Sequence, residues 1–198
     1  MTLTKEPFTI TKQEAQWVAS ALSRDTHREV LRYAALAYLN GETVLVSTDT
    51  HRLHILNLGG NVEHALKLID IRRVLLEASF VKASHIRIAK DFSEVEVGKV
   101  AQTKKHGDVF SQAFGILFPQ TSSTFPNFER VIPTTKEPLN EFTAVNARYL
   151  IDATMLAAGN NWKTAILGES NTRAMVFQPA SDTPRWKAVV MPMALEWK

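Results

Sequence analysis

Apolar and polar residues follow one pattern three times along the chain: a short strand, a helix, and then two or three further strands. In the first block the helix is expected from about Thr11 to Arg24. Thr11 followed by Glu14 is a capping box, which marks a helix start. Asn40-Gly41 predicts a tight hairpin, because both residues tolerate positive φ. The strands expected in this block cover about residues 8–10, 29–39, 42–47 and 52–58.

The second and third blocks repeat this order. One helix is expected from about Asp70 to Phe80 with Asp70 as its N-cap, and another from Asn146 to Ala158 with Gly159 as its stop. Residues 121–139, rich in proline, serine and threonine, are expected to form a linker. The strands expected here cover about residues 63–68, 85–90, 93–97, 109–118, 142–145, 163–168, 173–178 and 185–191, with a polar loop at 99–108.

The amino-acid composition is that of an ordinary globular protein, and it excludes several kinds of chemical site. The 198 residues include no cysteine, which excludes disulfides, thiolate metal sites and cysteine nucleophiles. No apolar run is long enough to span a membrane, and the first ten residues do not resemble a signal peptide. The formal charge of +3 is a mild basic bias, so any contact with nucleic acid should be dispersed along the backbone.

Three segments together resemble the bacterial DNA polymerase III beta sliding clamp. They are Val46 to Leu53 (VSTDTHRL), Phe125 to Pro133 (FPNFERVIP) and Val189 to Met193 (VVMPM). In this family the first segment carries the turn "ATDGHRL", the second ends the middle domain and the third closes the chain. Thr50 stands where the clamp has glycine, so the turn must form without easy positive φ. Ala194 stands where the clamp often has arginine.

The resemblance implies an α+β clamp fold with three strand-helix-strands units, antiparallel sheets outside and helices on the inner face. Residues 1–133 would correspond to the middle domain, and residues 134–198 to the second half of the last domain. The family is a processivity factor that encircles duplex DNA. The helix residues expected to face the DNA are Lys12, Gln13, Arg24, Arg72, Arg73 and Arg148. The alternative is that they are ordinary solvated charges, as in an Arg73–Glu77 pair.

The resemblance also implies an apolar pocket in which short peptides of partner proteins dock. Methionine suits such a rim because it is flexible and polarisable. The alternative is that residues 189–193 are only a buried final strand. Carried over position by position, the pocket residues are Leu31, Thr48, Thr50, His51, Arg52, Leu53, Pro133, Val189, Val190, Met191, Pro192 and Met193.

Catalysis is not expected. Asp49 and His51 share a strand face, but the sequence places no third ligand or nucleophile beside them, and a metal site needs three or four ligands. Gly59-Gly60 lacks the lysine and hydroxyl residue of a phosphate-binding loop. We therefore expect no cofactor, no metal and no enzymatic activity.

Three hypotheses follow. The first is a minimal sliding clamp from a phage or mobile element, acting in the bacterial cytoplasm with a DNA polymerase and a separate loader. The family ring contains twelve units, so three per chain would favour a tetramer, with third units pairing about a two-fold axis. The second is a clamp-derived adaptor that binds peptides of replication or transcription proteins without encircling DNA. The third, an enzyme using Asp49 and His51, has little support.

Overall fold

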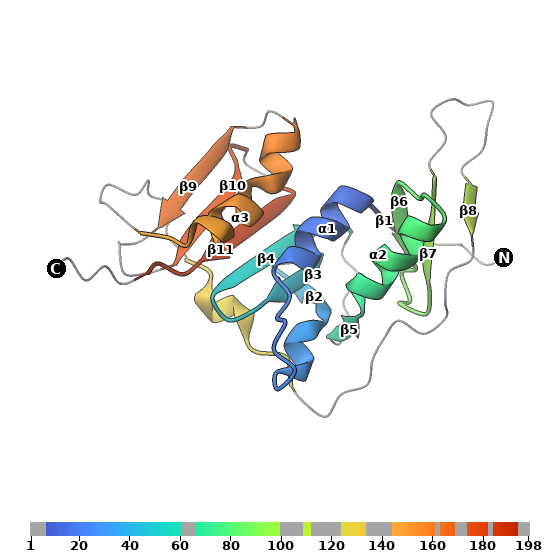
Figure 1. Cartoon of the computed structure of the whole chain (residues 1–198), viewed down its shortest axis with the longest axis horizontal. Helices are drawn as coiled ribbons and strands as arrows, with labels where there is room; N and C mark the ends of the chain where they lie inside the picture. Colours follow the sequence, from blue (N-terminus) through green and yellow to red (C-terminus); the bar gives the residue numbers. More distant parts are fainter. Residues whose placement is uncertain are drawn as a thin grey trace.

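Three helices lie side by side over antiparallel sheets (Figure 1). The computed structural model describes residues 7–60, 66–99, 109–111, 124–133, 144–160, 163–168, 174–181 and 184–193. Within these ranges, helix α1 (Lys12–Ser20) lies between α2 (Ile71–Phe80) and α3 (Ala147–Asn160). None of the described helices is long and apolar enough to cross a membrane. The predicted α+β class is confirmed.

The strands form two sheets. The smaller contains β1 (Phe8–Thr11), β6 (His85–Ile88), β7 (Val95–Lys99) and β8 (Val109–Ser111), in that order. The larger has seven strands, in the order β5 (Lys67–Ile69), β2 (Ala34–Leu39), β3 (Glu42–Thr48), β4 (Arg52–Asn57), β11 (Trp186–Val190), β10 (Met175–Pro179) and β9 (Thr164–Gly168).

The first two units exchange their first strands. Strand β1, which precedes α1, pairs with β6, and β5, which precedes α2, pairs with β2. The third unit joins differently: β11 pairs antiparallel with β4, with Leu53 opposite Val189 and Arg52 opposite Val190. The larger sheet therefore continues across the domain boundary that the sequence places at residue 133.

Several local predictions are confirmed. The Thr11 hydroxyl accepts from the Glu14 amide at 3.1 Å, and the Glu14 carboxylate accepts from the Thr11 amide at 2.7 Å. Asn40 and Gly41 have φ of +50° and +87°, as a tight hairpin requires. The Asp70 side chain caps α2 by accepting from the Arg73 amide at 3.1 Å.

Element boundaries differ from prediction. Helix α1 ends at Ser20 rather than Arg24, because the chain turns there and Ser23 donates its amide to the Leu31 carbonyl at 2.9 Å. Residues 29–32 form a 3-10 helix, η1, instead of strand. Helix α3 runs through Gly159, which costs a helix only about 1 kcal/mol and does not forbid it.

Three expected connections and strands are only partly described. The predicted linker contains a second 3-10 helix, η2 (Phe128–Val131), and Phe125 and Phe128 are buried. Of the strand expected at 142–145, residues 142 and 143 lie outside the described residues, and Ala144 forms a bridge with Met193. The predicted loop at 99–108 lies outside the described residues except for Lys99. The predicted strand at 109–118 is described only from Val109 to Ser111.

The larger sheet is buried on both faces. Side chains of successive strand residues point to opposite faces. Leu36, Leu45 and Leu56 therefore pack toward the helices, in the inner core. Leu53, Val189 and their neighbours pack on the other face, in what we call the outer cluster. Burial on both faces explains why β4 reads as a nearly continuous buried run and gives no alternating pattern.

Trp17 is the residue that sequence periodicity missed. Its ring stacks on His54 of β4 with centroids 4.3 Å apart and meets Trp186 of β11 edge-on at 5.7 Å. Its indole N–H donates to the carbonyl of Ala153 in α3 at 3.2 Å. One fully buried side chain thus joins α1 and α3 to the two strands where the third unit meets the first.

His54 lies fully buried at the same junction. Its Nδ1 is 2.9 Å from the Trp17 carbonyl and therefore carries the proton as donor. The pKa of His54 is lowered from 6.5 to about 3, chiefly by burial and also by the charge of Arg52, against the opposing effects of the Trp17 carbonyl and Asp152. The imidazole is therefore neutral in the folded protein at physiological pH.

His54 should make folding stability fall on mild acidification. Below pH 6.5 the unfolded chain binds a proton that the folded chain does not, so this stability is full above pH 6.5 and is lost toward pH 3. The loss is about 1.4 kcal/mol per pH unit. In His54→Phe, which retains an aromatic ring beside Trp17, it should vanish. Urea unfolding should show the wild-type advantage over this variant shrinking by about 2 kcal/mol between pH 7.5 and 5. Parallel pH profiles would contradict the assignment.

Candidate functional site

The outer cluster holds several of the residues predicted to line a peptide pocket. Leu31, Leu53 and Val189 lie together there and are almost fully buried. Phe125 and Phe128, from the segment expected to be a linker, pack on the same cluster. The resemblance to the clamp includes this segment but implies only Pro133 from it as a pocket residue, so the sequence prediction misses both aromatic residues.

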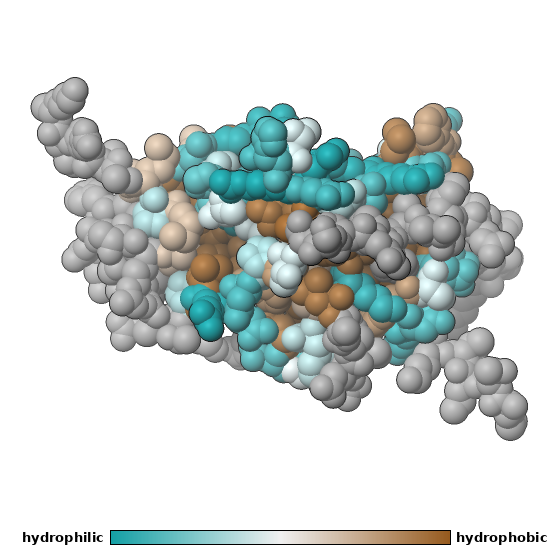
Figure 2. All heavy atoms as spheres, turned by 90° about the horizontal axis from the view of Figure 1, so that it is seen from below, coloured by the Kyte–Doolittle hydropathy of each residue, from teal (hydrophilic) through white to brown (hydrophobic). Residues whose placement is uncertain are grey.

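The rim of the outer cluster is exposed and apolar. Met191 is 40% exposed and Met193 is 53% exposed, and Val131 of η2 is 45% exposed. Strand alternation places Met191 on the same face as Val189. Figure 2 shows the molecule from below, where hydrophobic residues reach the surface between hydrophilic ones. The structure thus places buried apolar residues beside exposed methionines. Pro133 and Pro192 are half-buried.

Arg52 and Val190 lie on the opposite face of the sheet. They stand directly opposite each other in the β4–β11 pair and alternate with Leu53 and Val189. Val190 belongs to the inner core, and Arg52 points toward the helices. The structure therefore does not bring these two together with the other predicted pocket residues. The sequence motif lists consecutive residues, whose side chains point to opposite faces of a strand, so the motif alone does not separate the two faces.

The turn from Thr48 to Arg52 is held by its own side chains. Thr50 has φ of +82°, the left-handed region that the clamp motif fills with glycine. Its amide donates to the Thr48 hydroxyl at 3.1 Å, and Arg28 donates to its hydroxyl at 2.9 Å. Asp49 accepts from the amides of His51 and Arg52 at 3.0 and 3.1 Å. These bonds hold threonine in a conformation that it rarely adopts.

Asp49 and His51 do not form a catalytic pair in this geometry. The Asp49 carboxylate accepts from Arg52 Nε at 3.0 Å, and the His51 ring stacks on Tyr149 with centroids 6.2 Å apart. Among the residues that the structure describes, no cluster of three histidine and acidic side chains suits a metal.

Arg52 is the centre of a buried polar network. Its Nη1 donates to Asp152 of α3, and its Nη2 donates to the carbonyl of Ser20, the last residue of α1, at 2.5 Å. The guanidinium lies over the Tyr149 ring, 4.5 Å from its centroid. Asp152 also accepts from Arg148 at 3.3 Å. The network ties α3 to α1 and to β4.

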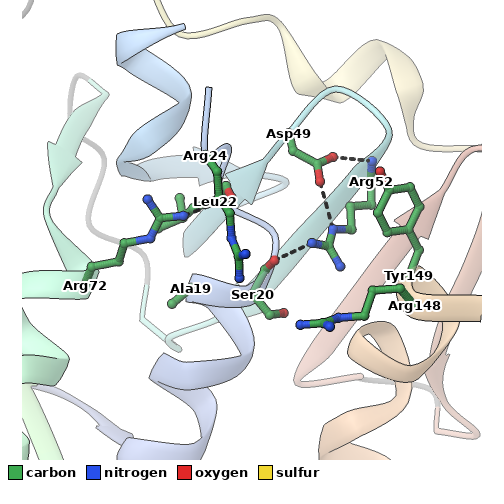
Figure 3. Close-up of a pocket in the computed structure, with 9 residues that line it drawn as sticks. All are labelled: Ala19, Ser20, Leu22, Arg24, Asp49, Arg52, Arg72, Arg148 and Tyr149. Atoms are coloured by element: carbon green, nitrogen blue, oxygen red, sulfur yellow. Dashed lines mark hydrogen bonds and ion pairs between the residues drawn. The ribbon is translucent and has the colours of Figure 1, made fainter. Parts of the chain in front are cut away.

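Beside this network lies a solvent-open cavity of about 630 Å³, which we call the arginine hollow (Figure 3). Three of the six residues expected to face the DNA line it, one from each helix region: Arg24, Arg72 and Arg148. Lys12, Gln13 and Arg73 do not. The lining residues are Ala19, Ser20, Leu22, Arg24, Asp49, Arg52, Arg72, Arg148 and Tyr149.

Positive charge is concentrated in the arginine hollow. Arg72 is half-buried and donates to the carbonyls of Leu22 and Ser23 at 3.1 and 3.2 Å. Burial lowers the pKa of Arg72, and the charges of Arg24 and Arg32 lower it further, while Asp70 opposes them. The basic residues are thus locally crowded, whereas composition alone suggested dispersed charge.

Comparison with known proteins identifies the fold. No family model matches the chain, and no curated protein matches it in sequence. Among solved structures, DNA polymerase III subunit beta from Borrelia burgdorferi matches 99% of this chain at 13% identity with a TM-score of 0.64. The Caulobacter crescentus beta sliding clamp matches 98% at 15% identity with a TM-score of 0.62. This chain has the sliding-clamp fold.

The fold predicted from the resemblance is therefore confirmed. The sliding clamp of Pseudomonas aeruginosa bound to griselimycin is also similar, with 15% identity over 98% of this chain and a TM-score of 0.56. The chain spans about two thirds of these clamps, covering 65% to 68% of their length.

The buried Arg52–Asp152 pair should be worth much more than an exposed pair. Asp152→Asn leaves a buried guanidinium short of one countercharge, which should lower the free energy of unfolding by about 3 kcal/mol. The matched control is Asp25→Asn, whose partner Arg28 lies 3.6 Å away on an exposed surface and should cost under about 0.5 kcal/mol. Urea unfolding measures both. Equal losses would show that the Arg52 network does not join the units.

Proposed function

We propose that this protein is a sliding-clamp-like processivity factor that encircles duplex DNA and binds partner proteins, including a DNA polymerase, without catalysing a reaction. The observation that carries the proposal is the clamp fold with three helices side by side and an arginine hollow among them. Positive charge on a helix layer suits the sugar–phosphate backbone, and contacts to phosphate are independent of sequence. Sliding requires contacts of this kind.

Encirclement requires more than one chain in this proposal. In the larger sheet β5 covers the outer edge of β2, whereas at the other end β9 is the last strand that the structure describes. Ile166 on β9 is 45% exposed, and Ile151 on the neighbouring helix α3 is 65% exposed. Within the part of the chain that the structure describes, an edge strand and exposed isoleucines thus occur in the third unit, and such features favour association. We propose a homo-oligomeric ring, with a tetramer as its form and a separate protein as loader.

Solution mass tests the assembly. Light scattering after size exclusion, at low and moderate salt, should give four times the 22.2 kDa of one chain. A dimer or trimer would contradict the tetramer and retain association. A monomer at every concentration would contradict the ring and leave a non-encircling adaptor that binds partner peptides.

The partner site is proposed at the rim of the outer cluster. Support comes from the exposed Met191 and Met193 beside buried Leu53 and Val189. Flexible methionines can adjust to different apolar peptides. Griselimycin, bound to the Pseudomonas aeruginosa clamp, is a suitable probe.

Met191→Ala should weaken griselimycin binding about tenfold, the effect of removing one well-placed interface side chain. Met191 is partly exposed, so the variant should fold normally. The control is Met155→Ala, because Met155 packs on the inner core, at the opposite face of the sheet. Calorimetric titration would measure both affinities. Equal affinities for wild type and Met191→Ala would place the ligand elsewhere, and no binding at all would remove the support for a peptide site.

A further inference from the structure

We propose that the arginine hollow is a discrete seat for a phosphate group, and that a backbone phosphate of the duplex occupies it. The second part rests on the proposed function. The first does not, because it follows from the geometry of the hollow. The protein would then bind the DNA backbone at one localised site in addition to dispersed contacts.

Three arginines reach the hollow from different elements. Arg24 follows the end of α1, Arg72 comes from α2 and Arg148 from α3, and all three side chains line the same cavity, with Arg24 between the other two (Figure 3). A single anion in this space would meet guanidinium groups on several sides. Guanidinium groups bind phosphate oxygens through paired N–H donors, so arginine suits this ligand better than lysine.

The charge of the hollow is not balanced by its own residues. Four guanidinium groups line it, with Asp49 as the acidic lining residue. Asp49 pairs with Arg52, and Asp152 pairs with both Arg52 and Arg148, so two carboxylates face four guanidinium groups. Arg24 lies close enough to Arg72 to disfavour the charge of Arg72. A bound phosphate would remove this repulsion.

Helix capping accounts for part of the arrangement. Arg52 and Arg72 donate to the carbonyls of Ser20, Leu22 and Ser23 around the end of α1. That structural role explains why these two guanidinium groups lie there. It does not explain Arg24, which is exposed and makes no hydrogen bond or ion pair with any other residue that the structure describes. Arg24 is therefore the residue whose removal tests binding without disturbing the fold.

The dimensions favour phosphate within a larger molecule. A cavity of about 630 Å³ that opens to solvent exceeds the volume of a simple inorganic anion. A phosphodiester with its flanking sugars fits such an opening. Free phosphate compounds share the same recognising chemistry, so the experiment must separate the two sources.

The test compares wild type with Arg24→Gln and with Arg130→Gln as matched control. Arg130 is an exposed arginine of η2, on the outer face of the sheet. In one arm, inorganic pyrophosphate at constant ionic strength should raise the melting temperature of wild type and Arg130→Gln but not of Arg24→Gln, since a ligand of the folded state stabilises it. If the melting temperature of the wild type did not rise, or rose equally in all three proteins, the proposed phosphate site would be contradicted.

In the second arm, anisotropy of a fluorescent 20-base-pair duplex is measured over a salt series. Arg24→Gln should bind about five-fold more weakly than wild type, with the slope of log affinity against log salt reduced by about one. Arg130→Gln should match wild type. An unchanged slope with a lost pyrophosphate shift would show a seat for free phosphate and overturn its assignment to DNA. If no variant binds duplex while the pyrophosphate shift still depends on Arg24, the proposed function fails and the seat stands.

Discussion

The pairing of β4 with β11 is the constraint on which the rest of the structure depends. It joins residues 130 to 138 positions apart into one seven-stranded sheet. Trp17 secures the helix side of this pair through His54, Trp186 and the Ala153 carbonyl. At the Arg52 end of the pair, Arg52 binds Asp152 of α3. Because a buried charge without its partner is costly, this junction fixes where α3 lies beside α1.

Both candidate sites follow from the two faces of that junction. Arg52 and Leu53 are neighbours in the chain. Arg52 lies in the polar network beside the arginine hollow, whereas Leu53 lies in the outer cluster. The same alternation separates Val190 from Val189. A short stretch of strand thus supports a basic surface on one side and an apolar surface on the other. The chemistry that each side offers, phosphate binding and peptide binding, belongs to the proposed function.

Local signals predicted most of the elements, because capping and turn residues act on their own neighbours. Thr11, Asp70 and Asn40-Gly41 each act within a few residues, and all behave as expected. The failures involve distant contacts. The end of α1 depends on Ser23 meeting Leu31, and the burial of Phe125 depends on packing against the larger sheet. A periodic pattern within one segment cannot indicate contacts of this kind, because the partner residue lies in another segment.

The sites were partly predictable for the same reason. The family motifs name Leu53, Val189 and Met191 as pocket residues, and these three lie on one face of the sheet, but a linear motif does not state which neighbours point away. The basic residues were found on helix faces, whereas their convergence in one hollow depends on how α1, α2 and α3 lie together. Trp17 and Asp152 escaped notice because their roles exist only across the junction.

Retention on DNA is the most direct test of the central claim, that copies of this fold enclose a duplex. The protein would be loaded onto a nicked circular plasmid and onto the same plasmid linearised, and then passed through a sizing column in moderate salt. We expect the protein to remain with the circular DNA and to leave the linear DNA through its ends. Equal loss from both, or equal retention on both, would contradict encirclement.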